Sequence, residues 1–113
     1  MTRNQISVIA EQIKNAMGGD AENICNGDCP IFAMRLVDAV GKGVIVNNLT
    51  NFDDILPEYE VTSTDVLPKP SRGNRYETSH CWVEIDGIYY DAFDTYGVSK
   101  ERDLQFVQKF GNE

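Results

Sequence analysis

The chain of 113 residues has few cysteines, a single histidine, a single tryptophan and a shortage of basic residues. Three cysteines are too few, and odd in number, for a disulfide framework, so free thiols are expected. The net charge is −8, from 18 acidic and 10 basic residues, whereas a nucleic-acid-binding protein usually has an excess of basic residues. The negative charge also opposes docking on anionic membranes. We therefore expect neither nucleic acid nor membrane among its partners.

Long hydrophobic runs are also missing. The first residues, MTRNQISVIAEQIKNAMGG, contain no apolar stretch as long as a signal-peptide core or a bilayer span. We interpret this N-terminus as the mature sequence of a cytoplasmic protein. The apolar fraction of 42% and the charged fraction of 25% are ordinary for a folded chain, and the length suits one domain over residues 1–113.

Apolar spacing predicts two helices in the first part of the chain. One covers residues 5–17, and a polar, turn-like segment follows at 20–28. The second helix covers 29–40, with Asp28 as its N-cap and Gly41 at its end. The second helix is the more apolar, which places it centrally.

Shorter elements are predicted in the remainder. Ser99 is expected to cap a last helix over 99–110, because apolar positions recur there at helical spacing. The other expected elements are strands at 44–46 and 59–66, a helical turn at 51–56 and a loop at 67–78 that carries Lys69, Arg72 and Arg75.

Residues 79–94, SHCWVEIDGIYYDAFD, contain a strong hairpin signal. Asp86-Gly87 lies between two β-prone runs, as a type I′ turn requires. With that turn, His80 and Asp91 are diagonal neighbours on one face, with backbones roughly 7–8 Å apart. Their side chains are then expected to meet, as in a catalytic His–Asp pair. A one-residue slip would separate them, and Asp94 would then be the next carboxylate to consider.

Cys29 is the candidate nucleophile. The first turn of a helix has unpaired N–H groups and the positive end of the helix dipole, and both favour a thiolate. A small, buried, apolar cysteine is the alternative interpretation of the same residue.

Three short blocks occur in a meaningful order. Residues 27–33, GDCPIFA, fit G-x-C-x-x-F-A; residues 80–84, HCWVE, fit H-x-W-V-E; and Tyr90-Asp91 follows. Together they resemble the transglutaminase-like branch of the papain-like cysteine-enzyme superfamily, and the order Cys, His, Asp also occurs in arylamine N-acetyltransferases. The resemblance implies an α+β fold in which a central Cys-bearing helix packs on an antiparallel sheet, with flanking helices.

The same resemblance implies a catalytic triad. Cys29 would be the nucleophile, His80 the general base and acid, and Asp91 the residue that orients His80. The implied reaction is acyl transfer: hydrolysis of an amide or isopeptide bond, or deamidation or transamidation. The substrate would be a peptide, a protein side-chain amide or a small amide, without cofactor or metal. Asn23 stands near the position of the papain-like oxyanion glutamine, and Trp82 either lines the site or packs in the core.

Two other functions remain open from the residues alone. A zinc site would use Cys25, Cys29 and His80, because the spacing C-x₃-C is permissible, although His80 and Cys81 should point to opposite faces of a strand. Alternatively, the chain is a non-catalytic binding or inhibitor module on the same fold that docks on a protein partner. We interpret Cys25 and Cys81 as bystanders, with only proximity to suggest Cys25 as a resolving thiol.

Overall fold

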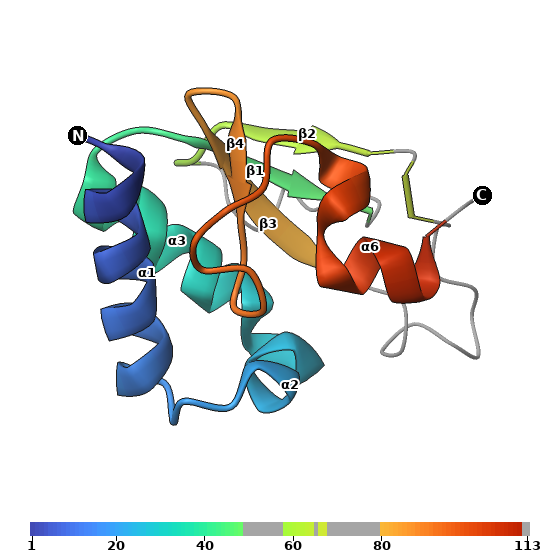
Figure 1. Cartoon of the computed structure of the whole chain (residues 1–113), viewed down its shortest axis with the longest axis horizontal. Helices are drawn as coiled ribbons and strands as arrows, with labels where there is room; N and C mark the ends of the chain where they lie inside the picture. Colours follow the sequence, from blue (N-terminus) through green and yellow to red (C-terminus); the bar gives the residue numbers. More distant parts are fainter. Residues whose placement is uncertain (49–57, 65, 68–79, 112–113) are drawn as a thin grey trace.

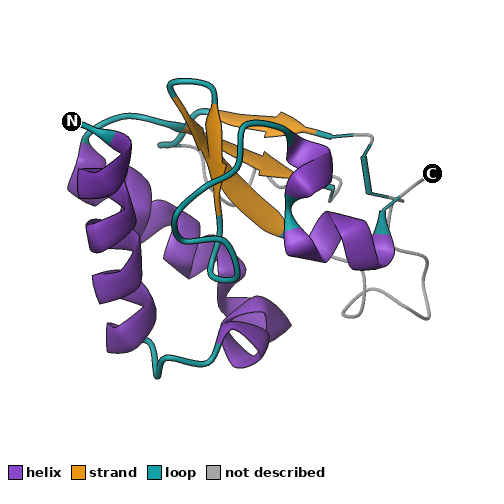
Figure 2. Ribbon diagram, in the orientation of Figure 1, coloured by secondary structure: helices purple, strands orange, loops and turns teal. Residues whose placement is uncertain are grey.

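The computed structural model describes residues 1–48, 58–64, 66–67 and 80–111 as an α+β arrangement, a four-stranded sheet with helices on both faces (Figures 1 and 2). The elements in chain order are α1 (Arg3–Ala16), α2 (Ala21–Asn23), the π-helical segment η1 (Ile24–Asp28), α3 (Cys29–Val40), β1 (Val44–Asn47), β2 (Val61–Ser63), β3 (Cys81–Ile85), β4 (Ile88–Tyr90), the 3₁₀ turn η2 (Glu101–Asp103) and α6 (Gln105–Phe110).

The first helix, α1, begins with a capping box. The Thr2 hydroxyl accepts a hydrogen bond from the Gln5 backbone N–H at 3.2 Å, and the Gln5 side chain accepts one from the Thr2 backbone N–H at 2.7 Å. Two otherwise unpaired donors are thereby satisfied. The predicted first helix is confirmed, with a start two residues earlier than its apolar spacing indicated.

The prediction for 20–28 is wrong, because this segment is helical. Asp20 caps α2 by accepting the Glu22 N–H at 3.0 Å, and α2 passes into the π-helical segment η1, which leads directly into α3. Asp28 makes no capping hydrogen bond with its side chain. Cys29 therefore follows a π-helical turn rather than a free helix N-terminus.

The sheet has the strand order β2-β1-β3-β4 and is mixed rather than antiparallel. β1 pairs with β2 in parallel and with β3 antiparallel. The expected fully antiparallel sheet is wrong at this one pairing, because the direction of a non-local pairing is set by the crossover between the strands and not by either strand's own sequence. The predicted strands at 44–46 and 59–66 are observed as β1 and the shorter β2.

The hairpin β3–β4 has the predicted register. Val83 pairs with Tyr90 and Ile85 with Ile88. Asp86 and Gly87 have φ angles of 53° and 80°, the left-handed values that both central residues of a type I′ turn require. The hairpin prediction is confirmed, and the open end of the hairpin lies where β3 begins and β4 ends.

Two apolar cores lie on opposite faces of the sheet. Cys81, Val83 and Ile85 of β3 face the core shared with α1 and α3, whereas Trp82 faces the core shared with α6. The alternation follows from the two-residue period of a strand. Figure 2 shows α1 and α3 on one side of the strands and α6 on the other.

The chain after β4 turns back along the hairpin before α6. Tyr89 and Val98 form an isolated antiparallel bridge, and Gly97 fits against Tyr90 where a Cβ atom would lie 2.7 Å from the tyrosine ring. The predicted cap at Ser99 is wrong. Instead, the Asp94 carboxylate accepts the Gln105 backbone N–H at 2.8 Å at the start of α6. A distant residue thus replaces the local cap.

Two predictions fall outside the described residues. These are the helical turn at 51–56 and the basic cluster of the 67–78 loop, Lys69, Arg72 and Arg75. In the part of the chain that is described, no helix has the length and apolar character needed to span a bilayer.

Candidate active site

Three strand ends meet at the open end of the hairpin. β1 ends before Asn48, β3 begins after His80, and β4 ends before Asp91. Because β1 and β4 both run antiparallel to β3, their C-terminal ends lie beside its N-terminal end. The Asn48 side-chain oxygen accepts the His80 backbone N–H at 3.0 Å, and both residues are buried. Asn48 thus fixes the backbone that carries the histidine.

His80 and Asp91 form a buried hydrogen-bonded pair. His80 Nε2 lies 2.8 Å from Asp91 Oδ2, and the two side chains are 0% and 1% exposed. The other carboxylate oxygen accepts the backbone N–H groups of Phe93 at 3.0 Å and Asp94 at 2.7 Å. These bonds hold the carboxylate in place, so that it fixes the plane of the imidazole.

One face of the imidazole ring is covered by a side chain of α6. Phe106 stacks on His80 with ring centroids 4.0 Å apart and an angle of 22° between the planes. Trp82 lies further away, tilted at 5.8 Å. The histidine is therefore held by one carboxylate, one backbone anchor and one aromatic ring, each from a different segment.

His80 Nδ1 is the ring nitrogen left for chemistry. It is buried and has no hydrogen-bond partner within the described residues. The thiols of Cys25 and Cys29 nevertheless lie close enough to the imidazole to shift its pKa. Nδ1 is thus the ring nitrogen that the bond to Asp91 leaves unused.

The charge balance around His80 favours the imidazolium. Burial works to lower the pKa of the imidazole, but the hydrogen bond that it donates to Asp91 and the interactions with Cys25 and Cys29 outweigh burial and raise the pKa well above 6.5. A buried histidine without such partners would be neutral at pH 7. Here the carboxylate makes the protonated ring the stable form.

Cys29 is the one thiol whose acidity increases. Interaction with the Cys81 thiol is the largest cause, opposed by burial and assisted by His80 and by the Cys81 backbone N–H, and together they lower its pKa from 9.0 to about 5. Burial is the main reason that the pKa of Cys25 is raised and that of Cys81 is raised well above 9.0. Cys29 is also partly exposed, whereas the other two thiols are buried.

Cys25 and Cys81 lie close to the other residues of this candidate site. Cys25 interacts with His80, and Cys81 interacts with Cys29. One signal for this was available, the position of Cys81 directly after the histidine. Phe106 and Asn48 were not anticipated either. For Asn48 a signal was available, because the polar pair Asn47-Asn48 at the end of a buried strand is unusual.

Asn23 and Trp82 were the candidates for binding the substrate or the oxyanion. Asn23 is exposed in α2, and its side-chain amide donates to Asp20 at 3.3 Å. Trp82 is fully buried against Val46 and the α6 core, and its Nε1 has no hydrogen-bond partner among the described residues. Of the two interpretations of Trp82, this position agrees with packing.

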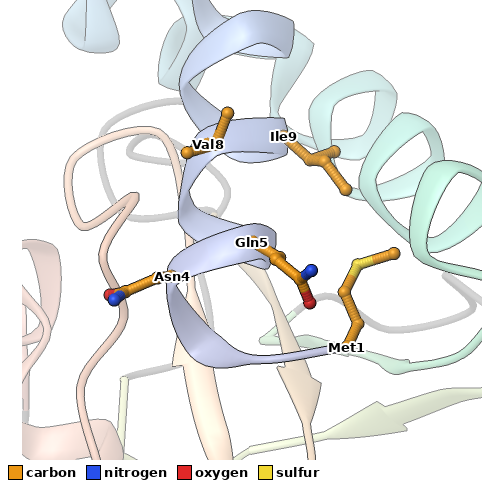
Figure 3. Close-up of a pocket in the computed structure, with 5 residues that line it drawn as sticks. All are labelled: Met1, Asn4, Gln5, Val8 and Ile9. Carbon is orange, nitrogen blue, oxygen red and sulfur yellow. The ribbon is translucent and has the colours of Figure 1, made fainter.

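No described group of three or more His, Cys, Asp or Glu side chains is arranged to hold a metal ion, so the geometry offers no support for zinc at Cys25, Cys29 and His80. A surface depression exists elsewhere, along α1. Figure 3 shows its lining residues, all from the first turns of the chain: Met1, Asn4, Gln5, Val8 and Ile9. It contains none of the thiols and neither member of the His–Asp pair.

Comparisons with family models, with curated proteins and with solved structures found no match to this chain. The function must therefore be inferred from the site itself.

Proposed function

We propose that the chain is a cysteine-dependent acyl-transfer enzyme with a papain-like or transglutaminase-like core. Cys29 is the nucleophile, His80 the general acid and base, and Asp91 the orienting carboxylate. The observation that carries the proposal is the buried bond of 2.8 Å between His80 Nε2 and Asp91 Oδ2, with Nδ1 lacking a hydrogen-bond partner among the described residues. A purely structural histidine would be expected to satisfy both ring nitrogens.

The resting state has the charges that such chemistry needs. With the pKa of Cys29 at about 5 and that of His80 well above 6.5, the pair is a thiolate and an imidazolium at neutral pH. A thiolate is the nucleophilic form of cysteine. An imidazolium is a proton donor ready for the leaving group. Neither requires a proton transfer before attack.

The proposed reaction has two stages. The Cys29 sulfur attacks an amide carbonyl, and the tetrahedral intermediate collapses as the imidazolium protonates the departing amine. The resulting thioester is attacked by water or by a second amine, from which the now neutral His80 removes a proton. Asp91 keeps Nε2 protonated throughout, so the same nitrogen, Nδ1, performs both transfers.

Hydrolysis of an amide or isopeptide bond is the leading form of the reaction, with deamidation or transamidation as the other outcomes of the same thioester. The substrate is a peptide, a protein side-chain amide or a small amide. Because the His–Asp pair is buried and Cys29 is partly exposed, the scissile carbonyl has to reach the site from the Cys29 side.

The proposal is tested by trapping the acyl-enzyme. The full chain is incubated with an activated acyl donor, such as a peptide thioester or a p-nitrophenyl ester, quenched in acid and analysed by mass spectrometry. We expect a covalent adduct on Cys29 that decays in water and is transferred to an added amine. His80→Ala should slow adduct formation, and because it leaves Asp91 buried without its partner, circular dichroism must first show that the variant is folded.

Cys29→Ala is the decisive variant, and Asp38→Asn, on an exposed part of the same helix, is the matched control. The first should abolish the adduct, and the second should leave it at the wild-type level. An adduct that survives in Cys29→Ala, or that maps to Cys25 or Cys81 in the wild type, would exclude Cys29 as the nucleophile. A folded wild-type protein that forms no adduct with any donor would favour the binding-module alternative.

A further inference from the structure

All three thiols of the chain lie in or against one apolar core, although acyl transfer needs only one of them. Cys81 lies on the face of β3 that is turned toward α3, in the same core as Cys25, and Cys29 packs against that core. Cys25 and Cys29 are close in the sequence, but Cys81 is more than fifty residues further along the chain. Only the fold brings Cys81 near the other two.

The three thiols differ in access and protonation. Cys25 and Cys81 are 7% and 2% exposed, whereas Cys29 is the partly exposed member. An oxidant arriving from solvent therefore meets the Cys29 thiolate first. Thiolates rather than thiols react with peroxides, so the first oxidation is confined to this one sulfur.

We propose that Cys29 and Cys81 are a redox pair, in which a hydroperoxide oxidises Cys29 and Cys81 resolves the product as a reversible intramolecular disulfide. The proposal does not depend on acyl transfer, since it uses only the thiolate at Cys29 and a second thiol beside it. It adds a modification site to the nucleophile, with hydroperoxides as the reacting class.

The two steps balance. In the first, the Cys29 thiolate attacks the peroxide, the O–O bond breaks, and Cys29 becomes a sulfenic acid while the departing alkoxide or hydroxide takes a proton and leaves as alcohol or water. In the second, Cys81 sulfur attacks the Cys29 sulfur, the S–OH bond breaks, and the hydroxide leaves with the Cys81 proton as water. Sulfur has lost two electrons in total, and the peroxide has gained them.

Cys81 suits the second step better than Cys25 does. The main thiol partner of Cys29 is Cys81, whereas Cys25 interacts chiefly with His80. Repulsion from the Cys29 thiolate is one of the causes that raise the pKa of Cys81. Oxidation of Cys29 removes that negative charge, so the resolving thiol becomes easier to deprotonate only after the first step has occurred.

The consequence for the site is direct. A disulfide at Cys29 removes the nucleophile and blocks further oxidation to sulfinic acid, which thiols do not reverse. A dithiol reductant exchanges with the disulfide and returns both thiols. The pair therefore protects the nucleophile and switches it off in the same event.

The test uses the reduced full chain and hydrogen peroxide. After one equivalent of peroxide the protein is denatured, alkylated with iodoacetamide and digested with a protease that cuts before aspartate. Cleavage before Asp28 separates Cys25 from Cys29, so the linked cysteines can be identified from the peptide masses. We expect loss of two hydrogen atoms from the intact mass, a peptide pair joined through Cys29 and Cys81, alkylation at Cys25 alone, and full recovery of free thiols with dithiothreitol.

Two variants separate the roles of the buried thiols. Cys81→Ser should lose the disulfide and accumulate a sulfenic acid at Cys29 that dimedone traps, while Cys25→Ser should retain the Cys29–Cys81 disulfide. Linkage of Cys29 to Cys25, a disulfide only between two copies of the chain, or direct conversion of wild-type Cys29 to sulfinic acid would each overturn the proposal. Because the wild-type peptide map decides it, poor folding of a variant does not remove the test.

The outcome is also independent of the proposed enzyme function. A protein that forms this disulfide but no acyl-enzyme retains the redox pair and loses the acyl-transfer assignment. A protein that forms the acyl-enzyme but no disulfide does the reverse.

Discussion

His80 Nε2 and Asp91 Oδ2 are 2.8 Å apart in a site where both side chains are almost completely closed to solvent. Removal of one member of such a pair leaves a buried group without its partner, which costs about 3–5 kcal/mol when the survivor stays charged. The contact therefore contributes to the conformation of the hairpin end as well as to the chemistry proposed for it. Substitutions there must be judged by both stability and reaction rate.

Asp91→Asn separates these two contributions. The amide keeps the volume of the carboxylate and can still accept the N–H groups of Phe93 and Asp94, but it has no negative charge with which to hold an imidazolium. We expect acyl-enzyme formation to slow by about 10²–10⁴-fold, the range seen when a catalytic histidine loses its base function or its correct tautomer. Single-turnover kinetics with an activated ester measures this rate.

The control for that variant is Asp38→Asn, an exposed carboxylate that accepts the Tyr59 hydroxyl on the outer side of α3. Its rate should match the wild type. If Asp91→Asn folds normally and reacts at the wild-type rate, the role of Asp91 as the orienting residue is excluded.

The pH dependence of Cys29 alkylation reports the charge state of the site. Since only the thiolate reacts, and since the pKa of Cys29 is lowered to about 5, the alkylation rate should rise through that pH and be constant at neutrality. An ordinary thiol would still gain rate toward pH 9. Initial rates with iodoacetamide between acid and alkaline pH provide the measurement.

The same experiment on Cys29→Ser supplies its control. Only Cys25 and Cys81 remain, and burial raises the pKa of each, so their alkylation should be slow and should keep rising above pH 9.0. A wild-type profile of that same shape would contradict a thiolate at Cys29. Acyl transfer should show a second limb, because it falls at high pH when His80 loses the proton that the leaving group needs.

The hairpin was predictable because its determinants are local. Asp86-Gly87 tolerates the left-handed backbone that a type I′ turn requires, and the alternation of the flanking strands then fixes which residues share a face. The encounter of His80 with Asp91 followed from that register alone. Of the candidate site, this half needed no tertiary information.

The rest of the site depends on contacts between distant segments. Phe106 stacks on His80 at the start of α6, where the Asp94 carboxylate accepts the Gln105 backbone N–H. The local N-cap preference had instead indicated a helix start at Ser99. The polar composition of 20–28 favours turns, yet Ile24 and Cys25 are buried there, and their packing sustains a helix that composition opposes. Tertiary packing overrode local propensity in both cases.

Phe106→Ala tests whether the stacked ring positions His80. Loss of a buried phenylalanine should lower the free energy of unfolding by about 3 kcal/mol. Val107→Ala lies in the same helix and the same apolar cluster and should cost about 2 kcal/mol, as expected for the removal of two buried methyl groups. Urea denaturation measures both values.

The two variants should differ in the histidine itself. Because the chain has one histidine, its ring resonances can be followed without ambiguity by NMR during a pH titration. Phe106→Ala should shift that titration and slow acyl-enzyme formation, whereas Val107→Ala should change neither. Equal shifts in the two variants would show that the stack has only a structural role.

Gly97→Ala probes the segment that follows Asp91. The backbone there has a φ of 86°, and a Cβ atom would lie 2.5 Å from Ile88 Cγ2 and 2.7 Å from the Tyr90 ring. We expect a loss of about 2–4 kcal/mol, from left-handed strain and overpacking together. Gly18→Ala is the matched control, since its φ is 102° and nothing lies within 4 Å of the new atom, so it should lose only the strain contribution. Equal losses in urea denaturation would contradict the close packing of Gly97.

The pH dependence of stability follows from the opposite pKa shifts of Cys29 and His80. The lowered pKa of Cys29 gives stability that is complete above 9.0 and is lost as the pH falls toward about 5. The raised pKa of His80 gives stability that is complete below 6.5 and is lost as the pH rises toward its folded value. Above 6.5, and below both 9.0 and the raised pKa of His80, the folded and unfolded forms of the pair each bind one proton, so the two contributions cancel and the pair adds no slope.

Cys29→Ala removes that cancellation. Asp91 still raises the pKa of His80, so the folded variant holds a proton that the unfolded variant has released above pH 6.5. Its free energy of unfolding, relative to that of the wild type, should therefore fall as the pH rises from 6.5, by up to about 1.4 kcal/mol per pH unit. Urea denaturation of both proteins at several pH values between 6 and 9 measures the difference. Parallel curves would contradict the combination of a lowered pKa at Cys29 and a raised pKa at His80.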